Sequence, residues 1–282
     1  MARHATRIQL RQCVLAISVL IELDVEPSDT GLVLTGVPDL AVTWRECRLA
    51  LDGADPETDF GRRRLARWLL RRRWVADHSL DDLAERVRPV GLPVAHVLHP
   101  GPTWVRQPVL GDSLHLGLGF LGLQPGEPDR VMLVPQTVLD SAGVDADHWW
   151  LSAAGYLEQM GARAAERYFR DRKAVLRPMG DCDVVTLFGS WVFRNAITGG
   201  DTGGLRPAVV PMRTRGWLDL SRIDPAFGPA AAAATEAVDR GFVRPILVTR
   251  DEVALVPEGG RPQIALQDPV TNDQWLRPVL YR

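Results

Sequence analysis

The chain has 282 residues, of which 46% are hydrophobic and 24% are charged, and its formal net charge at pH 7 is −2. A chain of this length and composition can bury a sizeable core, which excludes wholesale disorder and a small disulfide-stapled scaffold. The balanced charge also excludes a basic nucleic-acid footprint over the whole chain, so such binding would need a local patch. At about 150 residues per domain, the length predicts one or two domains.

The first residues imitate a secretory leader, because Arg3, Arg7 and Arg11 precede an apolar run over residues 13–21. No small-residue cleavage site follows, and the run is shorter than the ~20 residues that span a bilayer. We therefore expect neither a leader nor a membrane segment. Alternate residues from Cys13 to Val25 are apolar, which predicts a buried strand that pairs with 32–35 in a hairpin.

Cysteine usage indicates the compartment. Cys13, Cys47 and Cys182 are far apart, odd in number and form no CxxC pair. This pattern suits reduced thiols better than a disulfide framework, and it predicts a cytoplasmic protein.

Helix signals are clearest in the N-terminal half. Thr43 and Glu46 match a capping box that opens a helix to about Leu51. Residues 57–75 predict an amphipathic helix, and Ser79 caps a short second one. One side of the helix at 57–75 is apolar, with Trp68 at its edge, and the other side carries Arg63, Arg64, Arg67 and Arg71.

The C-terminal half mixes helices and strands. A long helix is expected over 147–172, a helix over 229–240, a strand at 131–134 and a hairpin from 243–248 and 253–256, whereas 181–197 suits a helix or a strand. This mixture without strict βαβ alternation predicts an α+β fold. The Pro/Gly-rich segment 124–128 predicts a linker between an N-terminal region, 1–124, and a C-terminal region, 129–282, unless the chain forms one continuous domain.

Two motifs offer weak cofactor signals. Residues 117–122 spell GxGxxG, but the prolines that follow block the helix on which a dinucleotide's phosphates would rest, so a glycine-rich strand or bend is expected. His96, His99, Asp112 and His115 carry metal-ligand chemistry. However, the prolines at 93 and 100 disfavour a helix around the first pair, and on a strand His96 and His99 would face opposite sides. We therefore expect no cofactor and no metal, with surface or hydrogen-bonded histidines in their place.

The most pointed short motif is the acidic pair Asp181 and Asp183. On a strand, both carboxylates would share a face and could hold Mg²⁺ or perform acid–base chemistry. At a helix start, they would instead act as capping residues, which is the interpretation we prefer. Cys182 between them is a poor nucleophile, because flanking carboxylates raise the pKa of a thiol.

The densest charge cluster lies at residues 62–73, which contain seven arginines and no acidic residue. A solvated face is one interpretation. The others are a surface for an acidic protein partner or for nucleic acid, with the stripe Arg63, Arg64, Arg67 and Arg71 making the contacts and Trp68 and Trp74 stacking. Acidic residues at 77–85 disfavour nucleic acid.

Three functional hypotheses follow. The first is a cytoplasmic interaction or regulatory protein, since no converging catalytic set is visible. The second is an enzyme of unassigned reaction that uses Asp181 and Asp183, with or without a metal. The third is a nucleic-acid binder that uses the arginine-rich helix.

Overall fold

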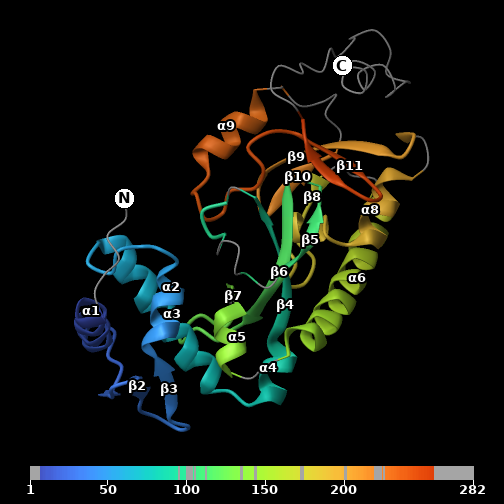
Figure 1. Cartoon of the computed structure of the whole chain (residues 1–282). Coiled ribbons are helices and arrows are strands. Elements are labelled where there is room, and N and C mark those ends of the chain that lie inside the picture. Colours follow the sequence, from blue (N-terminus) through green and yellow to red (C-terminus); the bar gives the residue numbers. More distant parts are fainter. Residues whose placement is uncertain are drawn as a thin grey trace. The chain divides into compact units, whose positions relative to one another are not determined.

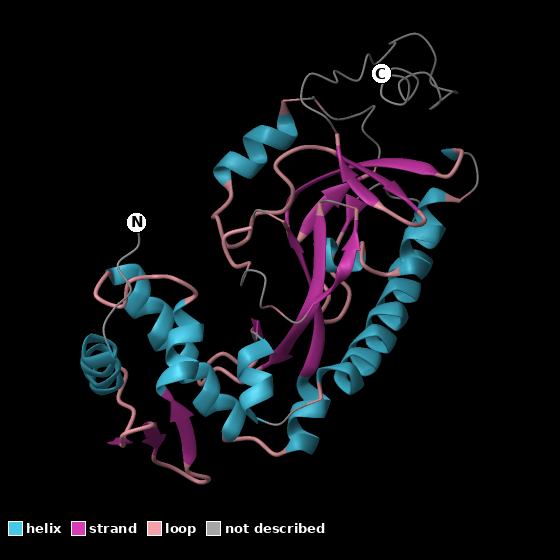
Figure 2. Ribbon diagram, viewed as in Figure 1, coloured by secondary structure: helices cyan, strands magenta, loops and turns pink. Residues whose placement is uncertain are grey.

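The computed structural model describes residues 7–94, 96–99, 104, 106–111, 113–133, 136–142, 145–171, 175–199, 202–218, 224 and 226–256. Helices and several small sheets are mixed along these residues, which confirms the α+β class (Figures 1 and 2). Within the described part of the chain, no helix combines the length and apolar character needed to cross a membrane.

The chain forms two compact units. The first comprises residues up to Val87 together with Phe120–Trp149, and the second comprises Arg88–Gly119 together with residues from Trp150 onward. The predicted linker at 124–128 lies inside the first unit. The chain passes from one unit to the other within β4 (Val87–Pro93), β6 (Leu114–Leu121) and α6 (Ala146–Asp171).

The first unit combines a small antiparallel sheet with short helices. The sheet has the order β1-β2-β3, and Leu32 of β2 lies opposite Val42 of β3. Its strands are β1 (Val25–Pro27), β2 (Gly31–Leu34) and β3 (Leu40–Thr43), and its helices are α1 (Arg7–Leu20), α2 (Trp44–Leu51), α3 (Asp59–Ala76), α4 (Leu80–Arg86) and α5 (Gln136–Ala142). Strand β7 (Val131–Leu133) also belongs to this unit.

The strand predicted from residue 13 is wrong, because residues 7–20 form helix α1. Leu10, Val14 and Ile17 are its buried apolar residues, and their spacing of four and three is that of one helix face. Ser18 completes this face, and its hydroxyl donates to the Val14 carbonyl at 3.0 Å. A nearly continuous apolar run is compatible with the period of a strand and with the period of a helix. Packing therefore decided between the two structures. Of the predicted hairpin, only the antiparallel pairing of β1 with β2 is present.

The predicted capping box at the start of α2 is present. The Glu46 amide donates to Thr43 Oγ1 at 3.1 Å, and the Thr43 amide donates to Glu46 Oε2 at 2.7 Å. The other carboxylate oxygen, Oε1, lies 3.7 Å from Arg72 Nη2, and the Arg72 side chain is only 1% exposed. Glu46 therefore links the start of α2 to a buried guanidinium of α3.

Besides Glu46 of α2, Arg72 reaches two other elements of the first unit. Its Nη1 donates to the Val138 carbonyl of α5 at 3.5 Å, and its Nη2 donates to the Ala41 carbonyl of β3 at 3.4 Å. Its Nε has no hydrogen-bond partner among the described residues. Burial lowers the pKa of Arg72, and Glu46 opposes that effect. Among the described residues, the Glu46 carboxylate is the acid that pairs with this buried charge.

The second unit is built on a sheet with the order β12-β11-β9-β10-β8. Its strands are β8 (Val175–Leu176), β9 (Leu205–Met212), β10 (Arg215–Trp217), β11 (Ile246–Thr249) and β12 (Val253–Leu255). Its helices, besides α6, are α7 (Val184–Leu187), α8 (Trp191–Thr198) and α9 (Phe227–Ala234). The predicted hairpin is present, since β11 pairs with β12 antiparallel. A further sheet has β6 between β4 and β5 (Arg106–Leu110).

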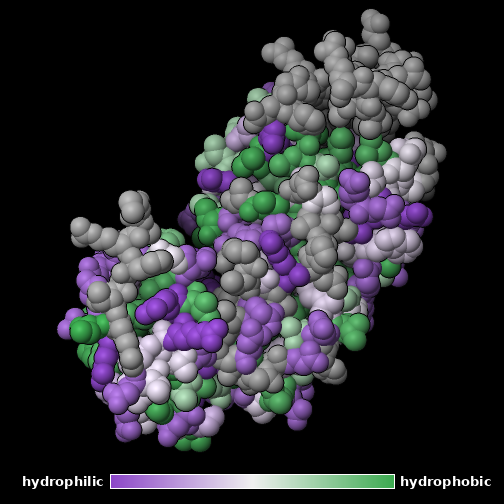
Figure 3. Space-filling view, viewed as in Figure 1, coloured by the Kyte–Doolittle hydropathy of each residue, from purple (hydrophilic) through white to green (hydrophobic). Residues whose placement is uncertain are grey.

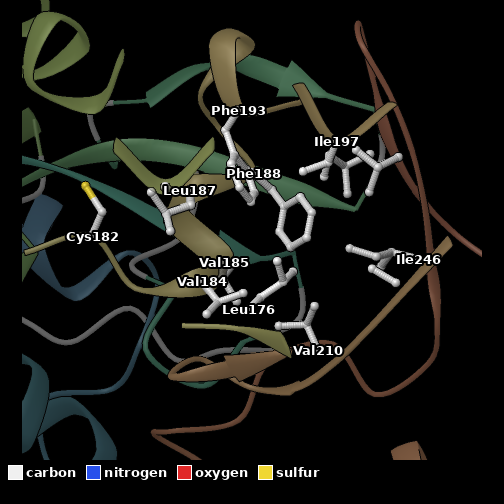
Figure 4. Packing of buried hydrophobic residues seen from close by; sticks show 14 of the residues in the cluster. Leu176, Cys182, Val184, Val185, Leu187, Phe188, Phe193, Ile197, Val210 and Ile246 are labelled. Atoms are coloured by element: carbon white, nitrogen blue, oxygen red, sulfur yellow. The ribbon is translucent and has the colours of Figure 1, made fainter. Parts of the chain in front are cut away.

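Residues 181–197, left open by the sequence, form the short helices α7 and α8. Asp183 and Ser190 are their N-caps, accepting the amides of Thr186 at 2.7 Å and Phe193 at 3.1 Å. Val184, Val185, Phe188, Phe193 and Ile197 of this segment point into the core (Figure 4), whereas Trp191 is 47% exposed. The rings of Phe188 and Phe193 meet there at 5.8 Å between centroids. Their burial, rather than strand pairing, explains the composition that made a strand plausible.

Two charged side chains, Glu158 and Arg194, fix α8 against its neighbours. The Glu158 carboxylate of α6 accepts the Ser190 hydroxyl at 2.7 Å and the amides of Trp191 and Val192 at 2.9 and 3.0 Å. Arg194, which is 3% exposed, donates to the carbonyls of Phe188, Gly189 and Arg250 at 2.7 to 2.9 Å. The amides in the first turn of α8 and the buried guanidinium of Arg194 therefore both have hydrogen-bond partners.

Replacing Glu46 separates its two roles. We expect Glu46→Ala to lower the free energy of unfolding by about 2–3 kcal/mol, since it removes a cap worth about 1 kcal/mol and leaves Arg72 without its acid. Glu46→Gln keeps the capping acceptor and should cost less. Urea unfolding of both variants measures the difference. A Glu46→Gln variant as stable as the wild type would show that the ion pair with Arg72 contributes nothing.

Candidate functional site

Helix α3 turns a mixed arginine and aromatic face to the surface. At 3.6 residues per turn, Phe60, Arg63, Arg67, Arg71 and Trp74 fall within an arc of roughly 80°. Phe60 is 61% exposed, Arg63 and Arg67 are exposed, and Arg71 and Trp74 are half-buried. We call these five residues the α3 face. Strongly hydrophilic side chains gather over α2 and α3 in Figure 3.

Three of the other four arginines of the cluster, Arg64, Arg72 and Arg73, are engaged inside the first unit, and Arg62 is exposed. Arg64 donates to the Ala50 carbonyl at 2.8 Å and pairs with Asp52 at 3.0 Å. Arg73 is buried, donates to the Pro38 carbonyl at 2.8 Å and pairs with Asp77. Together with buried Arg72, they show that the seven arginines divide between core and surface.

Trp68, expected to stack on a partner, is instead a core residue. Its side chain is 4% exposed, and its Nε1 is buried without a hydrogen-bond partner among the described residues. Trp68 lies about 80° around the helix from Phe60, on the side that carries Leu65 and Leu69. The half-buried aromatic residue on the α3 face is Trp74.

Arg71 sits among like charges. Burial lowers its pKa to about 10, and the neighbouring guanidiniums of Arg67 and Arg130 add to that effect. Among the residues that the structure describes, no carboxylate lies within ion-pair distance of Arg67 or Arg71. Arg130 precedes β7 and pairs with Glu127 at 2.6 Å. The three guanidiniums therefore form a cluster in which positive charge exceeds negative charge.

Helix α4, which follows α3 along the chain, carries the opposite charge. Asp81, Asp82 and Glu85 are exposed on it, and Asp82 completes a capping box with Ser79. A helix of seven residues with three exposed acids would repel the backbone of a nucleic acid.

The structure gives Asp181 and Asp183 separate partners. Asp181 Oδ2 accepts Arg88 Nε at 2.7 Å and the Tyr156 hydroxyl at 3.1 Å. Asp183 Oδ1 caps α7, and its Oδ2 accepts Arg213 Nε at 2.6 Å. The capping interpretation therefore describes Asp183. Each carboxylate is already neutralised by an arginine, an arrangement that disfavours a shared cation.

The cysteine between these aspartates is a buried thiol. Burial, followed by the charges of Asp183 and Asp181, raises the pKa of Cys182 to about 12. Burial likewise raises the pKa of Cys47 to about 12. All three cysteines are free, and a thiol with so high a pKa is almost entirely protonated at neutral pH.

Two of the four candidate metal ligands meet. His99 Nε2 lies 2.5 Å from His115 Nδ1, and Arg106 Nη1 lies 2.9 Å from the same nitrogen. Because a guanidinium only donates, His115 Nδ1 is an acceptor and His99 carries the shared proton. His96 contacts His99 through its backbone, since its carbonyl accepts the His99 amide at 2.9 Å, while its ring Nδ1 accepts the Leu98 amide at 3.1 Å.

This histidine pair is a poor cation site. Arg106 brings a positive charge against it, and no group of three His, Cys, Asp or Glu residues that could hold a metal occurs in the described part of the chain. The fourth candidate, Asp112, lies outside the described residues. Burial, then His115 and Arg106, lower the pKa of His99 to about 4. Both rings of the pair are therefore neutral at pH 7, because burial and Arg106 also lower the pKa of His115.

The GxGxxG segment is not followed by a helix. Residues 117–121 lie in strand β6, and Gly122 turns the chain with φ 67°. A Cβ at Gly122 would lie 2.7 Å from the Pro128 carbonyl oxygen, which explains why glycine stands there. The glycine-rich strand expected from the sequence is thus the observed structure.

Comparisons with protein-family models, with curated proteins and with solved structures return no match for this chain. The chemistry of the α3 face therefore indicates what it can bind. Its residues offer guanidinium donors and aromatic area, and they do not include a nucleophile with an activating base. Sequence periodicity identified Arg63, Arg67 and Arg71, whereas Phe60 and Arg130 were missed. Phe60 is on the same helical repeat and was detectable, but Arg130 required the tertiary structure.

The histidine pair should make the free energy of unfolding decrease in acid. The pKa of His99 falls from 6.5 to about 4 on folding, so stability is fully retained above pH 6.5 and declines as pH falls toward 4, where only the unfolded chain binds the proton. We expect His99→Gln to remove about 1–2 kcal/mol of this decline, less than the full linkage value because the ring is partly exposed. Urea unfolding at a series of pH values tests this. Parallel profiles for the variant and the wild type would contradict it.

The two aspartates should differ in their contribution to stability. Asp183→Ala removes the cap of α7 and the Arg213 pair, and we expect it to cost about 1–2 kcal/mol. Asp181→Ala breaks a pair in which the carboxylate side chain is 34% exposed, and it should cost less. Thermal unfolding of both variants measures the order. A magnesium-dependent stabilisation that both substitutions abolish would favour the enzyme hypothesis instead.

Proposed function

We propose that this protein is an interaction or regulatory protein, rather than an enzyme, that binds an acidic surface of another protein through the α3 face. The observation that carries the proposal is the pair Arg67 and Arg71, which lacks a carboxylate among the described residues. Arg64, Arg73, Arg88 and Arg213 have their acids within the same unit. A partner would supply the missing negative charge, and charge complementarity of this kind steers and orients association.

The composition of the α3 face supports a protein partner. Arginine and aromatic residues are enriched in the energetically important centre of protein interfaces. Phe60 is 61% exposed beside the arginines, so it offers apolar area to bury next to the charges. Trp74, half-buried at the other end of the face, offers the same.

The charge around this face favours a protein over nucleic acid. Asp81, Asp82 and Glu85 are exposed on the next helix of the same unit, where a continuous row of phosphates would meet them. A protein ligand presents its acids locally and avoids that repulsion. The free state of all three cysteines supports a reducing, cytoplasmic setting for this interaction.

Charge reversal at Arg67 tests the proposal. We expect Arg67→Glu to weaken binding of a fluorescein-labelled peptide rich in glutamate and leucine by about tenfold or more, roughly 1.4 kcal/mol, measured by fluorescence anisotropy. Arg163→Glu is the matched control, since Arg163 is also an exposed helical arginine but lies on α6.

Two outcomes would overturn the proposal. One is an equal loss of binding in Arg67→Glu and Arg163→Glu, which would indicate attraction to net charge alone. The other is tighter, Arg67-dependent binding of a labelled oligothymidylate, which would favour the nucleic-acid hypothesis.

A further inference from the structure

The α3 face carries more positive charge than one carboxylate can balance. Arg67 and Arg71 have no acid among the described residues, and Arg130 shares only Glu127 with the cluster. A glutamate or aspartate of a partner supplies one negative charge. A phosphorylated side chain supplies between about 1.5 and 2 at neutral pH, together with three strong acceptor oxygens.

The three guanidiniums also suit a phosphoryl group in their geometry. Arg67 and Arg71 are one helical turn apart, so their Cβ atoms are about 5–6 Å from each other on the same face. Arg130 approaches from another segment of the same unit, close enough to act electrostatically on Arg71. Each guanidinium presents a planar fork that matches two oxygens of a phosphoryl group.

Phe60 sets a second contact at a fixed distance. It lies nine residues before the midpoint of Arg67 and Arg71, which is about 13.5 Å along a helix that rises 1.5 Å per residue. An extended peptide covers that distance in about four residues, at 3.3 Å per residue. A ligand that fills both places would carry an apolar side chain about four positions from its charged group.

We propose that Arg67, Arg71 and Arg130 form a subsite for the phosphoryl group of a phosphorylated serine or threonine in an extended segment of the partner protein, with Phe60 contacting an apolar side chain about four residues away. This inference rests on the proposed function, because it names the ligand chemistry of the same α3 face. A single phosphoryl group fits the local surplus of charge, whereas a nucleic-acid backbone would extend over the acids of α4.

The test uses the full chain and three labelled peptides that are identical except at one position. That position holds phosphoserine, glutamate or serine, and a leucine stands four residues away. We expect fluorescence anisotropy to give a Kd for the phosphoserine peptide at least about tenfold lower than for the glutamate peptide. Moving the leucine two positions closer should weaken the phosphoserine peptide, as should Phe60→Ala.

Three variants connect this preference to the subsite. Arg67→Ala and Arg130→Ala should reduce the preference for phosphoserine over glutamate to within about threefold, and both side chains are on the surface, so folding is retained. Arg71→Lys keeps the charge but loses the fork, and it should reduce the preference without abolishing binding. Arg163→Ala should leave the preference unchanged.

The results separate the two proposals. If phosphoserine and glutamate peptides bind equally and both lose affinity in Arg67→Ala, the phosphoryl subsite is wrong and the acidic-partner function stands. If none of the peptides binds, both are wrong. If oligothymidylate competes with the phosphoserine peptide at lower concentration than the unlabelled peptide does, the subsite serves a nucleic-acid phosphate and the inference is overturned.

Discussion

The need to satisfy buried guanidinium groups determines how the helices of this protein are fixed. Arg72 in the first unit and Arg194 in the second are almost fully buried. A buried charge costs several kcal/mol unless acceptors surround it, so each arginine recruits carbonyls from other parts of its own unit. Arg72 takes those of β3 and α5, together with the Glu46 carboxylate of α2. Arg194 takes carbonyls before α8 and after β11.

The same residue type serves two opposite purposes along α3. Arg72 and Arg73 point inward and are held by fixed acceptors, whereas Arg67 and Arg71 face outward without a carboxylate among the described residues. Burial and then the neighbouring like charges already penalise the charged form of Arg71, so an anion at that place would stabilise it. The helix therefore joins a structural core to a surface that gains from binding.

Several other ionisable groups are satisfied locally. Asp181 and Asp183 each form an ion pair with an arginine, and the Glu158 carboxylate accepts hydrogen bonds at the start of α8. The thiols of Cys47 and Cys182 are buried and protonated at neutral pH. The carboxylates are paired and the thiols are uncharged, in contrast to the uncompensated positive charge of the α3 face.

Local signals in the sequence determined the elements that depend on neighbouring residues. The capping box at Thr43, the N-cap at Ser79, the amphipathic period of α3 and the hairpin at 246–255 all follow from contacts within a few residues, and all are present. The α+β class follows from their mixture. The exposed residues Arg63 and Arg67 of the α3 face could also be chosen from the helical period alone.

Tertiary structure decided what local pattern leaves open. The run after Cys13 became a helix because packing, not alternation, set its buried face. Trp68 and Arg72 became core residues because their position around α3 faces the unit's interior, which the apolar count of a segment does not reveal. Arg130 joined Arg71 across a long separation in sequence. Periodicity encodes which side chains share a face, whereas only the packed neighbours determine which face is buried and which distant charges meet.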